Sequence, residues 1–451
     1  MITLKELFDE SQKYDKKEIT VAGWVRNNRA QKEFGFLDLN DGSCFKTSQI
    51  VYEEKNLDNF REVQKYRCGV SVEVKGIFVL TPNMPQPFEI KAKEIILLGD
   101  SQEDFPIQPK RHTREFLREN LHLRVRTNLF HAVFRLRSEV EYAIHTFFHE
   151  RNFVYVNTPI MTSNDGEGAG ELFSVCTDTK NPKTDFFGKN VFLTVTGQLH
   201  VEPYAMAFRK VYTFGPTFRA ENSNTTKHAS EFWMVEPEIA FADLEDEQNL
   251  AEEMIRYIIK YVFDHCKDEL QLFDSFVEKG LINRLKAVLD SPKFERVTHH
   301  DAITILKESK IEFENVPEYG KDLATEHEKF LTKHFNGPVF VYNWPKEIKA
   351  FYMRINDDNE TVAGSDLLVP GSGEIIGGSQ REERLDVLLN RMNELGMNEE
   401  TLDWYVDTRR YGGCKHAGFG LGVERLLMFL TGIDNIRDVL SYPRTPKSCD
   451  F

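Results

Sequence analysis

The chain has 451 residues, enough for two or three domains of ordinary size. Hydrophobic residues make up 41% of it and charged residues 29%, which is a globular composition and excludes a collagenous, coiled-coil or mostly disordered chain. Its net charge of −15 argues weakly against a protein that coats nucleic acid in general, because the local distribution of charge matters more than the total.

The first hundred residues predict a small all-β domain. Apolar and polar residues alternate in five stretches, which Gly, Asn, Asp and Pro signals separate: 19–28, 34–41, 45–54, 69–80 and 88–99. Five short strands in so little sequence are typical of a closed barrel of the OB-fold type, which often binds oligonucleotides on one face. We therefore predict an OB-fold domain over residues 1–100.

A basic segment follows the predicted barrel. Residues 110–137 contain eight Lys and Arg residues but only two acidic ones, Glu115 and Glu119. A solvated helix face and a hinge that meets phosphates both explain this pattern. We predict a basic hinge over residues 101–126.

Residues 127–451 predict an α+β domain. Apolar residues recur at three- and four-residue spacing up to Glu150, which indicates a long helix. Strands are expected at 153–161, 190–197, 211–221, 231–241, 338–344, 350–356 and 364–378. Helices are expected near 243–290 and 381–396, and after a glycine-spaced strand from Gly418. Because helices and strands do not alternate as βαβ units, we predict a mainly antiparallel sheet flanked by helices, with an insertion near 290–335.

Signals for secretion and membrane insertion are missing from the sequence. The N-terminus lacks the apolar core of a signal peptide, and no apolar run approaches the ~20 residues of a membrane helix. The six cysteines are scattered without a CxxC pair, which argues against a disulfide framework and against a zinc site. We expect a cytoplasmic protein that does not enter membranes and holds no zinc.

The first candidate for chemistry is a strand, a polar loop and a second strand around residues 222–230. Arg219 precedes the loop and can grip phosphate oxygens through two donors. Phe232 follows the loop and can stack on a planar base. A surface hairpin with a core Phe explains the same pattern, so this motif alone leaves the question open.

Two further groups favour a nucleotide. Glycine spacing at 418–422 lets a ligand approach the backbone closely, and Arg425 would open the next helix near an anion-favouring N-terminus. Asp366 and Glu374, beside a glycine turn, can hold Mg²⁺ while substrate phosphates supply the remaining ligands. Tight packing and solvated carboxylates are the simpler explanations of each group alone. Together with Arg219 and Phe232, and without a Ser-His-Asp or Cys-His signature, they suit catalysis by positioning and charge neutralisation.

In this order the motifs resemble the class II aminoacyl-tRNA synthetases of the aspartate/asparagine/lysine subgroup, and most closely the asparagine-specific members. The stretch that ends at Pro159 is similar to motif 1, which builds the family's dimer interface; 211–241 is similar to motif 2 and 418–426 to motif 3. The resemblance runs nearly end to end. It implies an anticodon-binding barrel, a catalytic domain over 127–451, and a homodimeric, Mg²⁺-dependent ligase that joins L-asparagine to tRNA(Asn) through asparaginyl-adenylate.

The resemblance also assigns an ATP site, consisting of Arg219, Glu221, Lys227, His228, Phe232 and Arg425. Arg219 would hold the α-phosphate and Arg425 the γ-phosphate, which makes these two residues catalytic. Phe232 and Arg425 would sandwich adenine, and Glu221 would read its amino group. Lys227 and His228 would meet the β- and γ-phosphates. Asp366 and Glu374 would hold Mg²⁺.

The choice between asparagine and aspartate cannot depend on size, because the two are isosteric. A carboxamide offers donors and a carboxylate only acceptors, so an acidic neighbour favours asparagine. Aspartate enzymes of the family carry a lysine in a QxxK stretch; here Val201 holds that position and Glu202 follows. Arg381 would take the side-chain carbonyl and Glu167 the α-amino group. The implied asparagine site is Glu167, Glu171, Gln198, Glu202 and Arg381.

In the barrel, Arg26, Phe36 and Gln49 resemble the residues that stack on and hydrogen-bond to anticodon bases. The chain has two extra residues between Phe36 and Gln49 relative to some aspartate-type barrels.

Three other functions fit parts of this sequence. A relaxed aspartyl enzyme that charges both tRNAs is disfavoured by Val201 and Glu202. A paralogue that makes free asparagine typically lacks the anticodon barrel. A non-catalytic OB-fold RNA-binding protein would have no use for Arg219, Phe232, Glu374 and Arg425 together.

Overall fold

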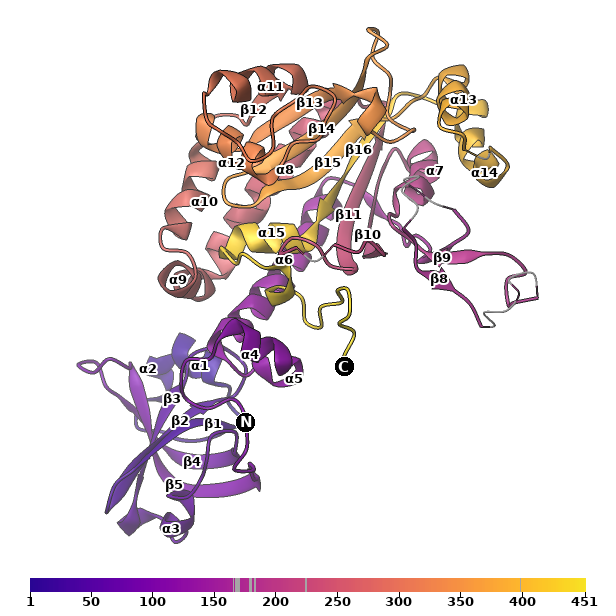
Figure 1. Cartoon of the computed structure of the whole chain (residues 1–451). Coiled ribbons are helices and arrows are strands. Elements are labelled where there is room, and N and C mark those ends of the chain that lie inside the picture. The colour runs from indigo at the N-terminus through magenta and orange to yellow at the C-terminus, as the bar shows by residue number, and fades with distance from the viewer. Residues whose placement is uncertain (165, 167–170, 178–180, 182–183, 224, 398) are drawn as a thin grey trace. The chain divides into compact units, whose positions relative to one another are not determined.

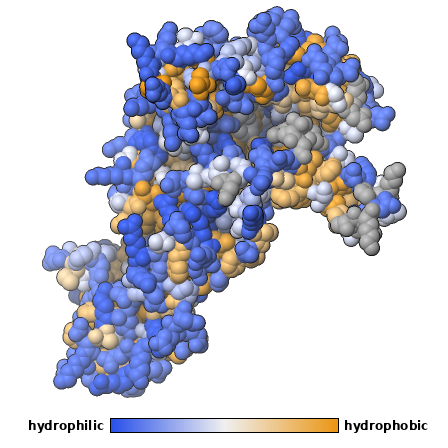
Figure 2. Space-filling model, viewed as in Figure 1, coloured by the Kyte–Doolittle hydropathy of each residue, from blue (hydrophilic) through white to orange (hydrophobic). Residues whose placement is uncertain are grey.

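The computed structural model describes residues 1–164, 166, 171–177, 181, 184–223, 225–397 and 399–451 (Figure 1). The chain divides into two compact units, Met1–Ala132 and Val133–Phe451. Hydrophilic side chains cover most of the face drawn in Figure 2, with apolar side chains scattered among them. None of the helices in the described residues is long and apolar enough to cross a membrane.

The first unit contains a closed barrel with the strand order β1-β2-β3-β5-β4. Its strands are β1 (Glu18–Ala30), β2 (Phe34–Asn40), β3 (Ser48–Glu53), β4 (Ser71–Leu80) and β5 (Phe88–Gly99). Every second residue points inward, as in β4, where Val72, Val74 and Phe78 are fully buried. The prediction of an OB-type barrel is confirmed.

Short helices complete this unit. They are α1 (Leu4–Asp9), α2 (Ser11–Tyr14), η1 (Glu54–Asn56), α3 (Phe60–Val63), α4 (Arg114–Glu119) and α5 (Leu121–Arg124). The last two form within the predicted basic hinge, and the Thr113 hydroxyl caps α4 by accepting from the Phe116 N–H. Arg124 is fully buried, with its guanidinium 4.2 Å from the centre of the Phe130 ring. At least one charge of the basic segment therefore serves packing rather than a phosphate.

The second unit is built on an eight-stranded sheet with the order β12-β13-β14-β15-β16-β11-β10-β6. Its strands are β6 (Val154–Tyr155), β10 (Lys210–Phe218), β11 (Glu231–Ala240), β12 (Glu295–Thr298), β13 (Val339–Pro345), β14 (Thr361–Val369), β15 (Gly373–Gln380) and β16 (His416–Gly422). Neighbours are antiparallel except at the two edges, where β12 and β6 run parallel to the next strand. The prediction of a mainly antiparallel sheet is confirmed.

The remaining elements of this unit surround the large sheet (Figure 1). The helices are α6 (Asn128–Glu150), α7 (Gln198–Phe208), α8 (Leu244–His265), α9 (Lys267–Phe276), α10 (Leu281–Asp290), α11 (His299–Glu308), α12 (Thr325–His334), η2 (Lys346–Ile348), α13 (Leu385–Glu394), α14 (Glu399–Arg410), α15 (Val423–Thr431) and η3 (Ile436–Asp438). A small sheet contains β7 (Met161–Thr162), β8 (Ser174–Val175) and β9 (Val191–Leu193). Helix α8 packs on β14, β15 and β16.

Two predicted strands are wrong. The stretch 350–356 makes only isolated bridges, at Met353 and Ile355, because its chain turns instead of running beside a neighbour. The stretch 364–378 is a hairpin of two strands rather than one. Pro370 ends the first strand, and Gly371 and Gly373 take positive φ angles of 88° and 77° that other residues rarely adopt.

The segment 290–335, predicted as an insertion, contributes one strand to the large sheet. Strand β12 pairs with β13, and the helices α11 and α12 pack over them around Val297, Leu306 and Leu331. The Thr298 hydroxyl accepts from the Asp301 N–H and so starts α11 directly after the strand. Helix α12 also contacts β14 and β15, the strands that carry Asp366 and Glu374.

Candidate active site

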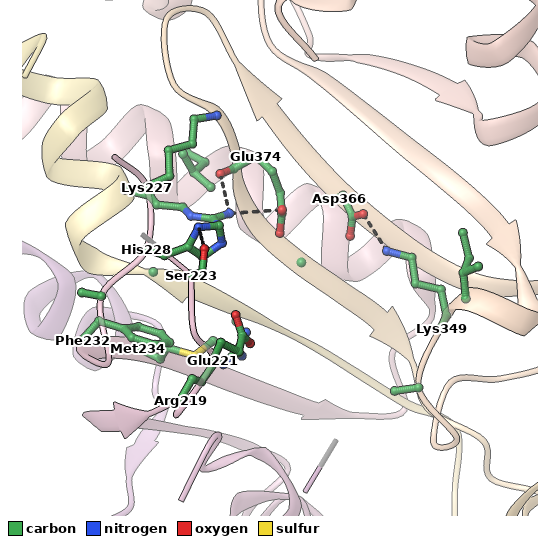
Figure 3. Close-up of a pocket in the computed structure, with 18 of the residues that line it drawn as sticks. Arg219, Glu221, Ser223, Lys227, His228, Phe232, Met234, Lys349, Asp366 and Glu374 are labelled. Carbon is green, nitrogen blue, oxygen red and sulfur yellow. Dashed lines mark hydrogen bonds and ion pairs between the residues drawn. The ribbon is translucent and has the colours of Figure 1, made fainter. Parts of the chain in front are cut away.

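A cavity of about 640 Å³ lies over strands β11, β14, β15 and β16 (Figure 3). Every residue predicted for the ATP and metal sites lines it: Arg219, Glu221, Lys227, His228, Phe232, Asp366, Glu374 and Arg425. These residues come from two hairpins and the start of a helix, so the fold gathers three distant stretches of sequence at one place.

Arg219 and Phe232 stand at the base of the β10–β11 hairpin. The register places Thr217 opposite Phe232, and the Arg219 N–H donates to the Ser230 carbonyl over 3.0 Å. The guanidinium carbon of Arg219 lies 5.4 Å from the centre of the Phe232 ring. A cation and an aromatic face are thus fixed side by side at the cavity wall, as binding of a phosphate and a planar base requires.

The loop of this hairpin is tied down by backbone bonds from other elements. The Ile436 N–H donates to the Thr226 carbonyl over 2.8 Å, and the Ser230 N–H to the Arg444 carbonyl over 2.7 Å. His228 Nδ1 lies 2.5 Å from the Thr225 hydroxyl. Burial and the charge of Arg425 lower the pKa of His228, so its imidazole is neutral at pH 7. His228 can therefore meet an anion as a hydrogen-bond donor but not as a cation.

Arg425 lies in the first turn of α15 and faces Glu374. Its Nη1 is 3.1 Å from both the carbonyl oxygen and the Oε2 of Glu374. Burial raises the pKa of Glu374, but Arg425 and Lys349 outweigh it and the pKa falls below its usual value. Glu374 is therefore ionised at neutral pH.

Asp366 and Glu374 converge over Gly377. A Cβ atom at Gly377 would lie 3.4 Å from Asp366 Oδ1 and 3.5 Å from Glu374 Oε1. Asp366 also pairs with Lys349, whose Nζ is 2.8 Å away. Burial raises the pKa of Asp366 to about 6 despite that lysine.

The carboxylate pair fits a divalent cation of the Mg²⁺ type. Two oxygens from neighbouring strands face one space that a glycine leaves open, and oxygen ligands are those that Mg²⁺ prefers. Among the described residues no group of three or more His, Cys, Asp or Glu side chains could hold a metal. Substrate oxygens and water would have to complete the coordination.

Arg381 belongs to a second, buried group of charges. Its Nε donates to Glu238 Oε1 over 2.8 Å, its Nη2 also reaches Glu238, and its Nη1 donates to the Ser379 hydroxyl over 2.8 Å. The guanidinium lies 5.3 Å from the centre of the Tyr352 ring. Glu238 was not among the residues predicted from the sequence, although Glu236 and Glu238 lie two residues apart on one face of β11 and this spacing was a usable signal.

Glu202 is fully buried among four donors. They are Gln198 Nε2 at 2.9 Å, the Tyr405 hydroxyl at 2.8 Å, Arg409 Nη2 at 3.0 Å and His416 Nε2 at 3.1 Å. Burial raises the pKa of Glu202, but Arg409 and His416 outweigh it and hold it well below its usual range. Glu202 is therefore a permanent charge, and Arg381 is near enough to stabilise it as well.

None of the described residues predicted for the asparagine site lines this cavity. Glu167 lies outside the described residues. The Glu171 side chain is exposed, and its carbonyl accepts from the Ala220 N–H over 2.9 Å. The backbone of Glu171 therefore contacts the hairpin that carries Arg219.

In the barrel, the structure joins Phe36 and Gln49 to Arg29 rather than to Arg26. Arg29 is the cross-strand partner of Phe36, its guanidinium lies 5.7 Å from the centre of that ring, and its Nη2 donates to Gln49 Oε1 over 3.2 Å. Arg26 instead donates to Asn40 over 3.2 Å. The register of β1 and β2 shifts between Val25 and Asn27, and such a bulge re-aims the side chain at its centre.

Glu247 of α8 is a buried carboxyl behind the sheet. Neither carboxyl oxygen has a hydrogen-bond partner among the described residues, and a Cβ at Gly378 would collide with it. Burial raises the pKa of Glu247 well above 4.5, against the pull of Arg381. The folded state therefore keeps a proton that the unfolded chain loses above about pH 4.5.

We predict that Glu247→Met stabilises the protein and does so increasingly as the pH rises. Since the folded state binds the extra proton, its stability falls as the pH rises from about 4.5 toward the raised pKa, and Met removes that loss. At pH 8 the free energy of unfolding should increase by about 1–3 kcal/mol. Denaturant unfolding at pH 5 and pH 8 measures it, with the exposed neighbour Glu245→Gln as a control expected to change little. A pH-independent loss of stability would show that Glu247 is an ionised, partnered group.

Comparison with known proteins places this architecture in one family. Residues 113–446 match the family described as class II tRNA synthetases (D, K and N), and residues 19–98 match the OB-fold nucleic acid binding domain. The chain belongs to the class II tRNA synthetases of this group. The predicted family and fold class are confirmed.

Relatives that match over the whole chain carry the name of one enzyme within this family. The chain is 59% identical to the "Asparagine--tRNA ligase" of Acholeplasma laidlawii, over 100% of both chains. It is 56% identical to the protein of the same name from Alkaliphilus metalliredigens, over 100% of this chain and 99% of the other. Among solved structures it is similar to asparaginyl-tRNA synthetase from Pyrococcus horikoshii complexed with asparaginyl-adenylate, with a TM-score of 0.90, 33% identity and 99% of each chain covered.

Proposed function

We propose that this chain is a ligase that joins L-asparagine to tRNA(Asn) in two steps. The asparagine carboxylate attacks the α-phosphorus of ATP, which forms asparaginyl-adenylate and releases pyrophosphate. The 3′-hydroxyl of the terminal ribose of the tRNA then takes the asparaginyl group and AMP leaves. One observation carries the proposal: Arg219, Phe232, Glu374 and Arg425 line a single cavity in a chain whose curated relatives are asparagine–tRNA ligases.

The first step depends on neutralising charge around the α-phosphorus. Negative charge shifts from the attacking carboxylate to the leaving pyrophosphate, and fixed donors aimed at these oxygens lower the barrier. Arg219 would hold the α-phosphate beside the adenine that stacks on Phe232, and Arg425 would reach the γ-phosphate from the start of α15. His228 would donate to the leaving phosphates as a neutral imidazole, and Lys227 would meet them as a cation.

Asp366 and Glu374 would hold Mg²⁺, which when bound would neutralise negative charge on the phosphate oxygens. Glu374 also contacts Arg425, so the proposed metal ligand and the residue proposed to reach the γ-phosphate are neighbours. Glu221 would read the adenine amino group at the other end of the site.

Asparagine would be selected by the balance of charge around Arg381. The side-chain carbonyl would accept from Arg381, while the carboxamide NH₂ needs an acceptor that a carboxylate provides. Glu238 forms an ion pair with Arg381, and the negative charge of Glu202 also favours the charged form of Arg381. An aspartate carboxylate would be repelled there. Gln198 would orient Glu202, and the segment with Glu167 and Glu171 would close on the α-amino group.

The anticodon would bind the barrel at Arg26, Phe36 and Gln49, and Arg29, which contacts Phe36 and Gln49, would join them. We predict that Phe36→Ala raises the KM for tRNA by roughly 5- to 150-fold, because base stacking on an aromatic ring contributes about 1–3 kcal/mol. ATP–pyrophosphate exchange, which needs no tRNA, should keep its rate. Aminoacylation kinetics measure the first quantity. An unchanged KM for tRNA would remove Phe36 from the interface.

We further propose a homodimer that pairs along the β6 edge of the large sheet. Tyr142, Tyr155 and Val154 are 65%, 44% and 40% exposed, and they lie on α6 and on the edge strand itself. Large exposed apolar side chains at a sheet edge are typical of a protein interface. Equilibrium sedimentation tests this, and a monomer at micromolar concentration would refute it.

For the compartment we propose the cytoplasm, with the six free cysteines as support. A fluorescent fusion that collects elsewhere in the cell would refute it. For the domains we keep the division into a barrel at 1–100, a basic hinge at 101–126 and a catalytic domain at 127–451. Limited proteolysis would cut first within 101–126 if the hinge is right.

The test of the function is ATP–pyrophosphate exchange by the purified full chain, with asparagine or aspartate and without tRNA. Exchange with asparagine alone, abolished by removal of Mg²⁺, is the expected result. Exchange with both amino acids would indicate a relaxed enzyme that charges both tRNAs. No exchange with either would refute the proposal.

A further inference from the structure

Helix α12 brings a carboxylate against the loop that carries Lys227. Glu328 Oε2 lies 3.4 Å from Lys227 Nζ, and only 12% of the Glu328 side chain and 23% of the Lys227 side chain are exposed. Lys227 lines the cavity, whereas Glu328 is not among the described residues that line it. The ammonium group thus meets the cavity while its partner stays outside the lining.

The pair rests on the turn between β14 and β15. Gly373 has a φ of 77°, and a Cβ there would collide with Glu328 Oε2 and lie 3.0 Å from Lys227 Nζ. Helix α12 also packs on β15, the strand that Gly373 begins. The helix, the loop and the hairpin therefore converge at this ion pair, which leaves the Glu328 carboxylate little freedom to move.

A lysine at the edge of a cavity binds an anion more tightly when a partner already holds its side chain in place. Its ammonium is a point charge on a flexible four-carbon stem, and binding an anion with it requires the stem to be ordered. The ammonium has three donors, so one can remain on Glu328 while the others reach an anion. Glu328 in turn lies on helix α12, which packs against strands β14 and β15, and not on a loop.

We propose that Glu328 is a positioning residue for ATP, which holds Lys227 where its ammonium meets the β- and γ-phosphates. This inference rests on the proposed function and assigns the 290–335 segment a part in substrate binding. Because the contact concerns the triphosphate end alone, Glu328 affects the affinity for ATP and for pyrophosphate but not for asparagine.

The test is Glu328→Gln in the full chain, measured by ATP–pyrophosphate exchange with asparagine. The KM for ATP should rise about tenfold, the loss expected for one charge-assisted contact, while the KM for asparagine and kcat stay within about twofold. The matched control is Glu318→Gln, which breaks an exposed pair with Lys321 in the same segment and should leave all three constants unchanged.

A double mutant separates positioning from a general structural effect. Lys227→Met should raise the KM for ATP by itself, and Glu328→Gln added to it should raise it no further. If Glu328→Gln does not fold, Glu328→Asp keeps the charge on a shorter stem and should raise the KM for ATP by a smaller factor. Additive effects in the double mutant, or an equal rise in the KM for asparagine, would overturn the inference.

A lowered KM for ATP in Glu328→Gln would also overturn it, because Glu328 would then compete with the triphosphate for Lys227. An active wild type with an unaffected Glu328→Gln variant would refute this inference alone. A wild type that exchanges pyrophosphate with neither amino acid would refute the proposed function and this inference with it.

Discussion

Arg219→Ala should lower the rate of ATP–pyrophosphate exchange by about 10³-fold, as the loss of one fixed donor at a developing charge does. The effect is this large because the proposed reaction forms no bond to the protein and depends on positioning and charge neutralisation. Arg219 lies beside Phe232 at the base of the hairpin, and under the proposed function its removal takes away the cation that would hold the α-phosphate. Exchange kinetics with saturating asparagine and ATP measure the effect.

The variant must remain folded for this result to count. Arg219 is held at the hairpin base through its backbone N–H, which alanine keeps, so thermal unfolding and sedimentation should match the wild type. Arg61→Ala is the control, because that arginine is an exposed barrel residue that pairs only at the surface with Glu54. A folded Arg219→Ala variant with normal exchange would refute the assignment of the site.

Glu202→Gln should have the largest effect on stability, a loss of about 3–5 kcal/mol in the free energy of unfolding. Removal of the charge leaves the buried guanidinium of Arg409 without its carboxylate, and Gln cannot accept from all four present donors. Denaturant unfolding measures the loss. Glu253→Gln, which breaks an exposed pair with Arg151, should cost less than about 1 kcal/mol.

The same variant tests the choice of amino acid. With one negative charge removed near Arg381, the proposed asparagine site becomes more positive and should tolerate the aspartate carboxylate better. The ratio of exchange with asparagine to exchange with aspartate should therefore fall, by roughly tenfold for a change of about 1.4 kcal/mol. An unchanged ratio in a folded variant would move the discrimination to Glu238 or to the segment around Glu167.

Local sequence was sufficient to predict that most of the residues proposed to bind ATP lie together, because they belong to short hairpins. Arg219 and Phe232 are separated by one loop, and the antiparallel register brings them together without help from the rest of the chain. Asp366 and Glu374 are likewise joined by one tight turn. For Arg219 and Phe232, alternation along the strands already decides that the two side chains share a face. Asp366 and Glu374 also need the shift of register between Leu367 and Leu368, because regular alternation would put Glu374 and Gly377 on opposite faces.

Contacts between distant elements could not be predicted in this way. Glu202 meets Tyr405, Arg409 and His416, more than 200 positions away, and no pattern near Glu202 announces them. The contacts of Arg29, rather than Arg26, with Phe36 and Gln49 have a different cause, a shift of register between Val25 and Asn27 that alternation does not predict.

The sequence by itself determined the class of fold, the family and the residues predicted for ATP that line one cavity, because these depend on local periodicity and on motifs of fixed spacing. The tertiary structure alone decided that Glu202 is a buried, fully partnered charge and that Glu238 holds Arg381. It also decided that residues 290–335 add a strand to the sheet and place Glu328 beside Lys227. Each of these is a pairing of charges or strands across more than 40 positions of sequence, where only the packed chain brings the partners within reach.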